Sequence, residues 1–135
     1  MSIVQSIRPQ AVLLEKDVSL AATAGTTVGI SVPAGVTVLA AGFQNYTVVP
    51  DVTTYTLDVT DGTTVFANDL NFDNTAANSN KGGVTPGFIA AADTIDVVTT
   101  ISGSPGIITG RVFAVIVPVE KGWAAPGAAD RDQLA

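Results

Sequence analysis

The chain has 135 residues, of which 47% are hydrophobic and only 13% are charged, and its net charge is −6. This length suits a single domain that buries about two-thirds of its unfolded surface. The acidic balance and the six dispersed basic residues exclude a nucleic-acid binder and argue against adhesion to an anionic membrane. Because soluble domains usually carry about a quarter charged residues, we expect neighbouring copies to cover part of the surface; the alternative is a charge-poor monomer.

Cysteine and histidine are both absent. Disulfides and thiolate metal sites are therefore excluded, and the commonest general base and zinc ligand are missing. We expect no metal, no cofactor and no enzymatic activity. No segment approaches the roughly 20 apolar residues of a membrane span, so we also expect a soluble chain without a secretion signal.

The first 19 residues are predicted to form an N-terminal arm and a first β segment. Ile3 and Ile7 lie in the arm without a clear period, so it either packs on a partner or frays as an ordinary terminus. Residues 11–21 fit a short helix or a bent pair of strands equally well.

Residues 20–120 are predicted to form a β-sandwich domain. Short runs rich in Val, Ile, Thr and aromatic residues alternate there with Gly, Pro and Asn turn signals, and Asp61-Gly62 is a strong hairpin signal. No helical pattern of the length that a β-α-β unit needs separates these runs. The predicted strands cover residues 26–32, 36–42, 43–49, 54–59, 63–72, 88–92, 94–101 and 110–119.

The run over 110–119, GRVFAVIVPV, is predicted to be the central strand. Its residues are apolar at both alternating sets of positions, which is typical of a strand covered on both faces. The polar segment over 73–87 is predicted to be a surface loop, and 102–106, SGSPG, a turn. Residues 121–135 are predicted to be a tail, in which Trp123 either caps the domain's own core or anchors the tail on a neighbouring subunit.

Three acidic patterns have a structural explanation as well as a functional one. Asp69, Asn71 and Asp73 are spaced like the first ligands of a calcium loop, but the rest of that motif is missing, and a strand with one wet face gives the same spacing. The pairs Asp58/Asp61 and Asp93/Asp96 would serve glycoside hydrolysis only if they faced each other across a cleft. Aspartates at turns more often accept backbone N–H bonds.

Four segments, in this order, carry a family resemblance: AATAGTTVGISVPAGVTVLAAG (21–42), YTLDVTDGTTVFANDLNF (55–72), GFIAAADTIDVVTTISG (87–103) and GRVFAVIVPV (110–119). Together they resemble small β-sandwich virion proteins of tailed bacteriophages. The resemblance covers about residues 20–120 and leaves out both ends of the chain.

The resemblance implies an all-β, antiparallel, jelly-roll-like sandwich of about eight strands with extended N- and C-terminal arms. It also implies a capsid decoration or cement protein on the outer surface of the virion, a homotrimer whose partner is the major capsid protein. Ile3, Ile7 and Trp123 are then the expected interface residues. The alternative is a head-fibre or tail-fibre domain that binds host carbohydrate through Tyr46, Tyr55 and Phe88.

Overall fold

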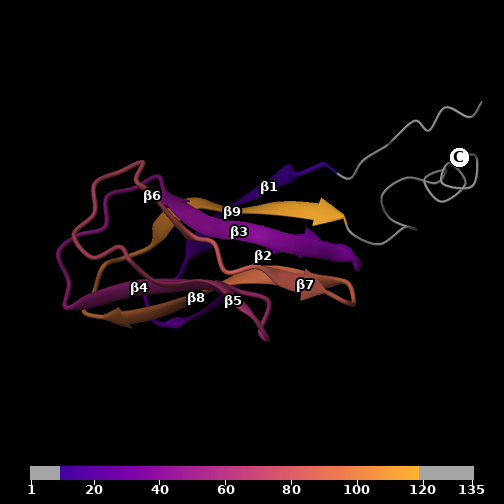
Figure 1. The fold of residues 1–135 in the computed structure, drawn as a ribbon. Coiled ribbons are helices and arrows are strands. Elements are labelled where there is room, and N and C mark those ends of the chain that lie inside the picture. Colours follow the sequence, from indigo (N-terminus) through magenta and orange to yellow (C-terminus); the bar gives the residue numbers. More distant parts are fainter. Residues whose placement is uncertain (1–9, 119–135) are drawn as a thin grey trace, which may run out of the picture.

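The computed structural model describes residues 10–118, which form nine strands in two packed antiparallel sheets (Figure 1). No helix in the described residues has the length and hydropathy that a bilayer span requires. The strands are β1 (Val12–Leu20), β2 (Gly25–Val32), β3 (Val36–Asn45), β4 (Thr54–Thr60), β5 (Val65–Asn71), β6 (Asn80–Gly83), β7 (Gly87–Ile89), β8 (Asp93–Ser102) and β9 (Ile108–Pro118).

The strand order is that of a jelly roll. One sheet runs β1-β9-β3-β6, with β7 also paired to β3, and the other runs β2-β8-β4-β5. Because β6 pairs with Ala41–Gln44 and β7 with Val36–Val38, they occupy one interrupted strand position beside β3. Eight strand positions in two four-stranded sheets of this order make a double Greek key. The predicted all-β sandwich of about eight strands is therefore confirmed.

The core lies between the two sheets and is built from alternate residues of nearly every strand. Its largest fully buried side chains include Tyr55, Phe43, Phe66 and Phe72. Phe43 and Phe72 meet edge to face, with their ring centroids 5.6 Å apart. The aromatic side chains thus join β3 of one sheet to the end of β5 of the other.

Two stretches that the sequence left open or divided are single strands. Residues 11–21 hold β1, which pairs with β9 from Val12 to Leu20 and is neither a helix nor a bent pair. The predicted strands over 36–42 and 43–49 are joined at their boundary, because β3 runs without a break from Val36 to Asn45. No proline or turn interrupts the chain at Gly42-Phe43, so pairing with β9 continues through it.

The prediction of a surface loop over 73–87 is partly wrong, because β6 lies within it. The sequence of β6, Asn-Lys-Gly-Gly, has low strand propensity. It is a strand because β3 offers an open edge and Gly82 lies opposite Gly42, where two glycines let the backbones approach. The predicted hairpin at Asp61-Gly62 is confirmed: Gly62 has φ 93°, and the loop joins Thr60 to its pairing partner Val65.

Candidate interaction surface

The outer face of β9 is open in this chain. Val112, Ala114 and Ile116 point into the core and are at most 2% exposed, whereas Phe113 and Val115 alternate with them and are only half-buried. The prediction that both faces of this strand are covered therefore holds for one face only. The other face is apolar and belongs to the surface of the β1-β9-β3 sheet.

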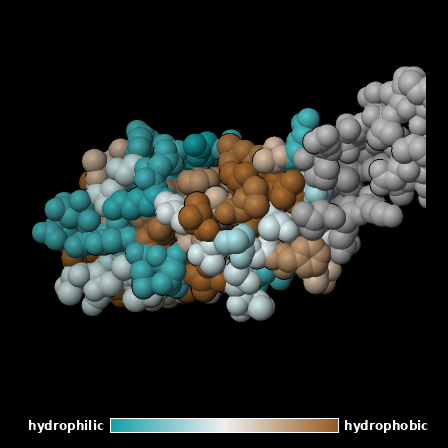
Figure 2. Space-filling view, in the orientation of Figure 1, coloured by the Kyte–Doolittle hydropathy of each residue, from teal (hydrophilic) through white to brown (hydrophobic). Residues whose placement is uncertain are grey.

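Neighbouring strands extend this face into an apolar patch. Leu13 of β1 lies opposite Val115 and is 55% exposed, and Leu39 of β3 is 40% exposed. Figure 2 shows hydrophobic surface gathered over this sheet, toward the end at which the described chain starts and stops. We define the apolar patch as Leu13, Leu39, Phe113, Val115 and Val117.

Two backbone features shape the apolar patch. The register of β3 against β9 shifts between Val38 and Ala40, and this bulge places both Leu39 and Ala40 on the outer face. Gly42 lies opposite Phe113, and a Cβ at Gly42 would be 2.6 Å from the tip of the Phe113 ring. The missing side chain leaves room for that ring to lie across the sheet.

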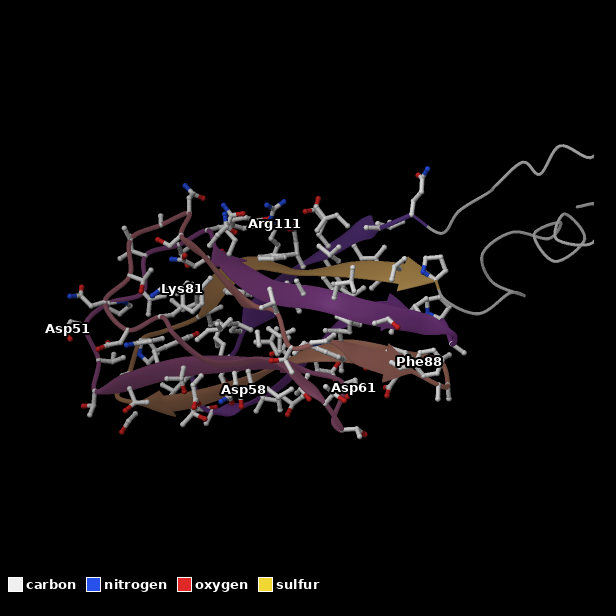
Figure 3. The ribbon with its side chains drawn as sticks, viewed as in Figure 1. Asp51, Asp58, Asp61, Lys81, Phe88 and Arg111 are labelled. Carbon is white, nitrogen blue, oxygen red and sulfur yellow. The ribbon has the colours of Figure 1, made fainter. Side chains whose placement is uncertain are left out.

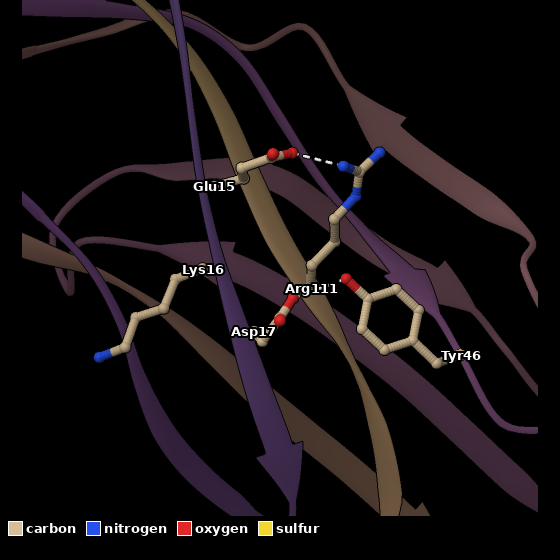
Figure 4. Close-up of a pocket in the computed structure, with 5 residues that line it drawn as sticks. All are labelled: Glu15, Lys16, Asp17, Tyr46 and Arg111. Atoms are coloured by element: carbon tan, nitrogen blue, oxygen red, sulfur yellow. Dashed lines mark hydrogen bonds and ion pairs between the residues drawn. The ribbon is translucent and has the colours of Figure 1, made fainter.

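The other half of the same outer face is polar. Glu15 and Arg111 form an ion pair between β1 and β9, and the hydroxyl of Tyr46 donates a 2.6 Å hydrogen bond to Asp17 (Figure 4). These four residues and Lys16 line an open depression of about 330 Å³. The outer face thus combines the apolar patch with a polar area in which Glu15 is paired with Arg111 and Asp17 with the hydroxyl of Tyr46.

The polar area lacks the features of a catalytic centre. The hydrogen bond to Asp17, with burial adding to it, raises the pKa of Tyr46 above its ordinary value of 10.0, so the phenol stays protonated at neutral pH. A protonated phenol beside a carboxylate, and a guanidinium paired with a second carboxylate, supply contacts and no activated nucleophile. The arrangement suits binding to another surface.

The three residues predicted as an interface, Ile3, Ile7 and Trp123, lie outside the described residues. The sugar-binding alternative loses its aromatic platform. Tyr55 is fully buried, and Phe88 pairs with Thr37 near the start of β3, whereas Tyr46 follows its end. Nine extended residues separate those ends by roughly 30 Å. Figure 3 shows Phe88 at one end of the molecule, away from Arg111.

The paired aspartates accept backbone N–H groups, as predicted, but Asp58 and Asp96 do so from within β4 and β8 and not from turns. Asp58 accepts the N–H of Asp69 at 2.7 Å, and Asp61 accepts the N–H groups of Thr63 and Thr64. In the second pair, Asp93 accepts the N–H of Thr94. Asp96 accepts the N–H of Gly29. Each of the four carboxylates therefore already accepts at least one backbone N–H group.

The calcium-like spacing also has its structural explanation. Leu70 and Phe72 are buried in the core, whereas Asp69 and Asn71 are exposed, as expected of a strand with one wet face. Asp69 has φ 52°, so the strand is irregular there. The Asp73 carboxylate accepts the N–H of Val52 at 2.7 Å. Among the described residues no group of three acidic side chains is placed to hold a metal ion.

The fold is similar to those of chains in two solved phage capsid structures. Neither the models of protein families nor the curated protein sequences match this chain. A chain in the acidic stable capsid structure of Helicobacter pylori bacteriophage KHP30 aligns with a TM-score of 0.55 and 12% identity, covering 83% of this chain and 94% of that one. A chain of the cyanophage Pam1 capsid asymmetric unit aligns with a TM-score of 0.59 and 14% identity, covering 86% and 89%.

These two likenesses concern the fold. The jelly roll described above is shared, over most of each chain, with chains of two phage capsid structures. The resemblance to phage virion proteins that the sequence predicted is thereby matched at the level of architecture. The outer face of β1-β9-β3 was not predicted as a site, although the apolar alternation on both faces of β9 was its signal in the sequence.

Proposed function

We propose that this chain is a non-enzymatic structural protein of a tailed-phage virion, a decoration or cement protein that binds the lattice of the major capsid protein. The observation that carries the proposal is the jelly-roll fold shared with chains of two phage capsid structures over 83% and 86% of this chain. Jelly rolls are a recurrent fold of capsid proteins. The outer face of β1-β9-β3 adds an open contact surface of mixed chemistry.

Charge supports a position on the outer surface of the capsid. The chain carries a net charge of −6, and its basic residues are few. Proteins that face packaged DNA neutralise phosphates with clustered Lys and Arg. An acidic chain is repelled from that side and tolerated on the outside.

The proposed assembly is a homotrimer that clamps joints between major capsid proteins. Each copy supplies a modest contact, and threefold symmetry multiplies it into stable attachment. The segments around Ile3, Ile7 and Trp123 supply the contacts that reach beyond the sandwich. Clamping of this kind raises the temperature at which the shell breaks.

The test is cosedimentation with capsids of the phage that encodes the chain, prepared without it. We expect saturable binding to the shell and a higher temperature of genome release. A chain that stays in the supernatant at saturating concentration would contradict the proposal, and binding to a glycan array would favour the fibre alternative. A variant that ends at residue 120 is expected to lose occupancy; full occupancy would remove the tail from the proposal.

A further inference from the structure

The apolar patch on the outer face of β1-β9-β3 has no role within the sandwich itself. It is too small to join two copies face to face. Its five side chains expose a few hundred Å², whereas a stable contact buries roughly 800 Å² on each partner. One large aromatic side chain, which buries about 150–250 Å², matches it far better.

The chain that follows β9 holds one such side chain. Seventeen residues follow Pro118, and Trp123 is the only tryptophan in the sequence. Around it, residues 124–129 read Ala-Ala-Pro-Gly-Ala-Ala, which are small enough to lie close to a flat sheet. The segment starts beside the apolar patch, since Val117 belongs to the patch and immediately precedes Pro118.

We propose that the apolar patch of one copy binds Trp123 of a second copy, so that copies of the chain are joined by exchanged C-terminal segments. This proposal names the contact within the homotrimer of the proposed function and rests on it. Trp123 covers Phe113 and Val115 of the neighbour. In a ring of three copies whose patches face the axis, each segment starts next to the patch of the following copy.

The short distance along the chain between Pro118 and Trp123 favours the patch of a neighbour over the chain's own patch. Pro118 is still paired with Val36, so a return onto the same copy has only Val119–Gly122 in which to reverse direction. Residue 123 would then lie over residue 118, and Pro126 would lie over Val115. Trp123 would therefore miss Phe113 and Val115 of its own copy. A segment from another copy has no such constraint. Five extended residues carry Trp123 roughly 17 Å from Pro118, against about 13 Å for the length of the apolar patch along β9.

Trp123 is its own probe, because its fluorescence reports burial. In the intact protein we expect emission at short wavelength and weak quenching by iodide at high concentration, both lost on dilution. Val115→Lys is expected to shift the emission to longer wavelength. Val84→Lys is the matched control, because Val84 is 78% exposed and lies outside the apolar patch, and it is expected to leave the emission unchanged.

Mixing two variants separates exchange from self-contact. Trp123→Ala keeps the apolar patch and has no tryptophan, while Val115→Lys keeps Trp123 and loses the patch. We expect the mixture to restore the short-wavelength emission of the Val115→Lys copies. Leu13→Lys, at an exposed position of the edge strand β1, serves in the same mixture if Val115→Lys fails to give the circular dichroism spectrum of a folded protein.

Two results would overturn the inference. One is that the intact protein keeps its short-wavelength emission as a monomer, and that mixing the two variants does not restore this emission. The other is that iodide quenches Trp123 fully at every protein concentration. The capsid assay reads out the proposed function separately. Capsid binding without restored emission would contradict only the exchange of C-terminal segments. Restored emission without capsid binding would contradict only the proposed function.

Discussion

At Gly42 the strands β3 and β6 approach too closely for a side chain. A Cβ there would be 2.6 Å from Phe113 Cζ, 2.8 Å from the Cα of Gly82, and closer still to the carbonyl oxygen of Lys81. Because backbone atoms yield less than side chains, Gly42→Ala is expected to lower the free energy of unfolding by about 1–3 kcal/mol. Urea denaturation measures the change.

Gly25→Ala is the control for Gly42→Ala. A Cβ at Gly25 meets nothing within 4 Å, and its φ is not in the left-handed region. This change restricts the unfolded chain, so we expect it to be neutral or to stabilise the protein by up to about 1 kcal/mol. Equal losses in the two variants would contradict the close approach of β3 and β6.

Tyr55 gives the fold a dependence on alkaline pH. Its ring is fully buried, its hydroxyl has no hydrogen-bond partner among the described residues, and burial raises its pKa to about 12. The unfolded chain releases this proton near the ordinary value of 10.0, before the folded chain does. The contribution of Tyr55 to the free energy of unfolding is therefore fully present below pH 10 and is lost as the pH rises toward 12.

Tyr55→Phe isolates this effect. We expect the variant to lack the component of the alkaline stability loss that comes from Tyr55. At neutral pH we expect its free energy of unfolding to rise by about 1 kcal/mol, since an unpartnered buried hydroxyl is removed. Denaturant titrations of both proteins from pH 7 to pH 12 measure the difference, and parallel curves would show that Tyr55 is not the group responsible.

At the scale of the strand, the two faces of β9 have different roles. Ile116 is buried between the sheets and 2% exposed, whereas Val117 lies on the outer face and is only half-buried. Ile116→Ala is expected to cost about 2–5 kcal/mol, and Val117→Ala roughly 1 kcal/mol or less. Thermal or urea unfolding at low concentration, where exchanged segments dissociate, compares them. Similar costs would mean that Val117 is also a core residue.

Strands that carry their own pattern were predictable from the sequence. The alternation of Tyr55, Leu57 and Val59 located β4, and the glycine of Asp61-Gly62 located the turn after it. The strand β6 was not predictable, because its four residues have no propensity for extended structure. Only the open edge of β3 makes them a strand, and an edge is a property of the assembled sheet.

The apolar character of the outer face could be predicted from the sequence, but its position on the surface of the fold could not. Local sequence showed that both faces of β9 are apolar, but the covering of one face depends on which strands assemble around it. Leu39 joins the apolar patch through a bulge, and Glu15 meets Arg111 because β1 pairs with β9 across 96 positions of sequence. Registers between distant segments are fixed by the fold, so the sequence alone did not bring these residues together.

Copies of the complete chain are expected to associate. In the proposed assembly, Trp123 of a second copy covers the apolar patch. Light scattering after size-exclusion chromatography is expected to give three times the 13.7 kDa of one chain. The midpoint of thermal unfolding should rise with protein concentration, since association stabilises only the folded state. A monomer at all concentrations would contradict the homotrimer.

Electron cryomicroscopy of capsids lacking the chain, imaged before and after it is added, decides whether the chain binds the outside of a phage capsid. We expect additional jelly-roll density in threes on the outer surface, above the joints between major capsid proteins. Unchanged capsids at saturating concentration, or density on the inner surface only, would contradict this expectation.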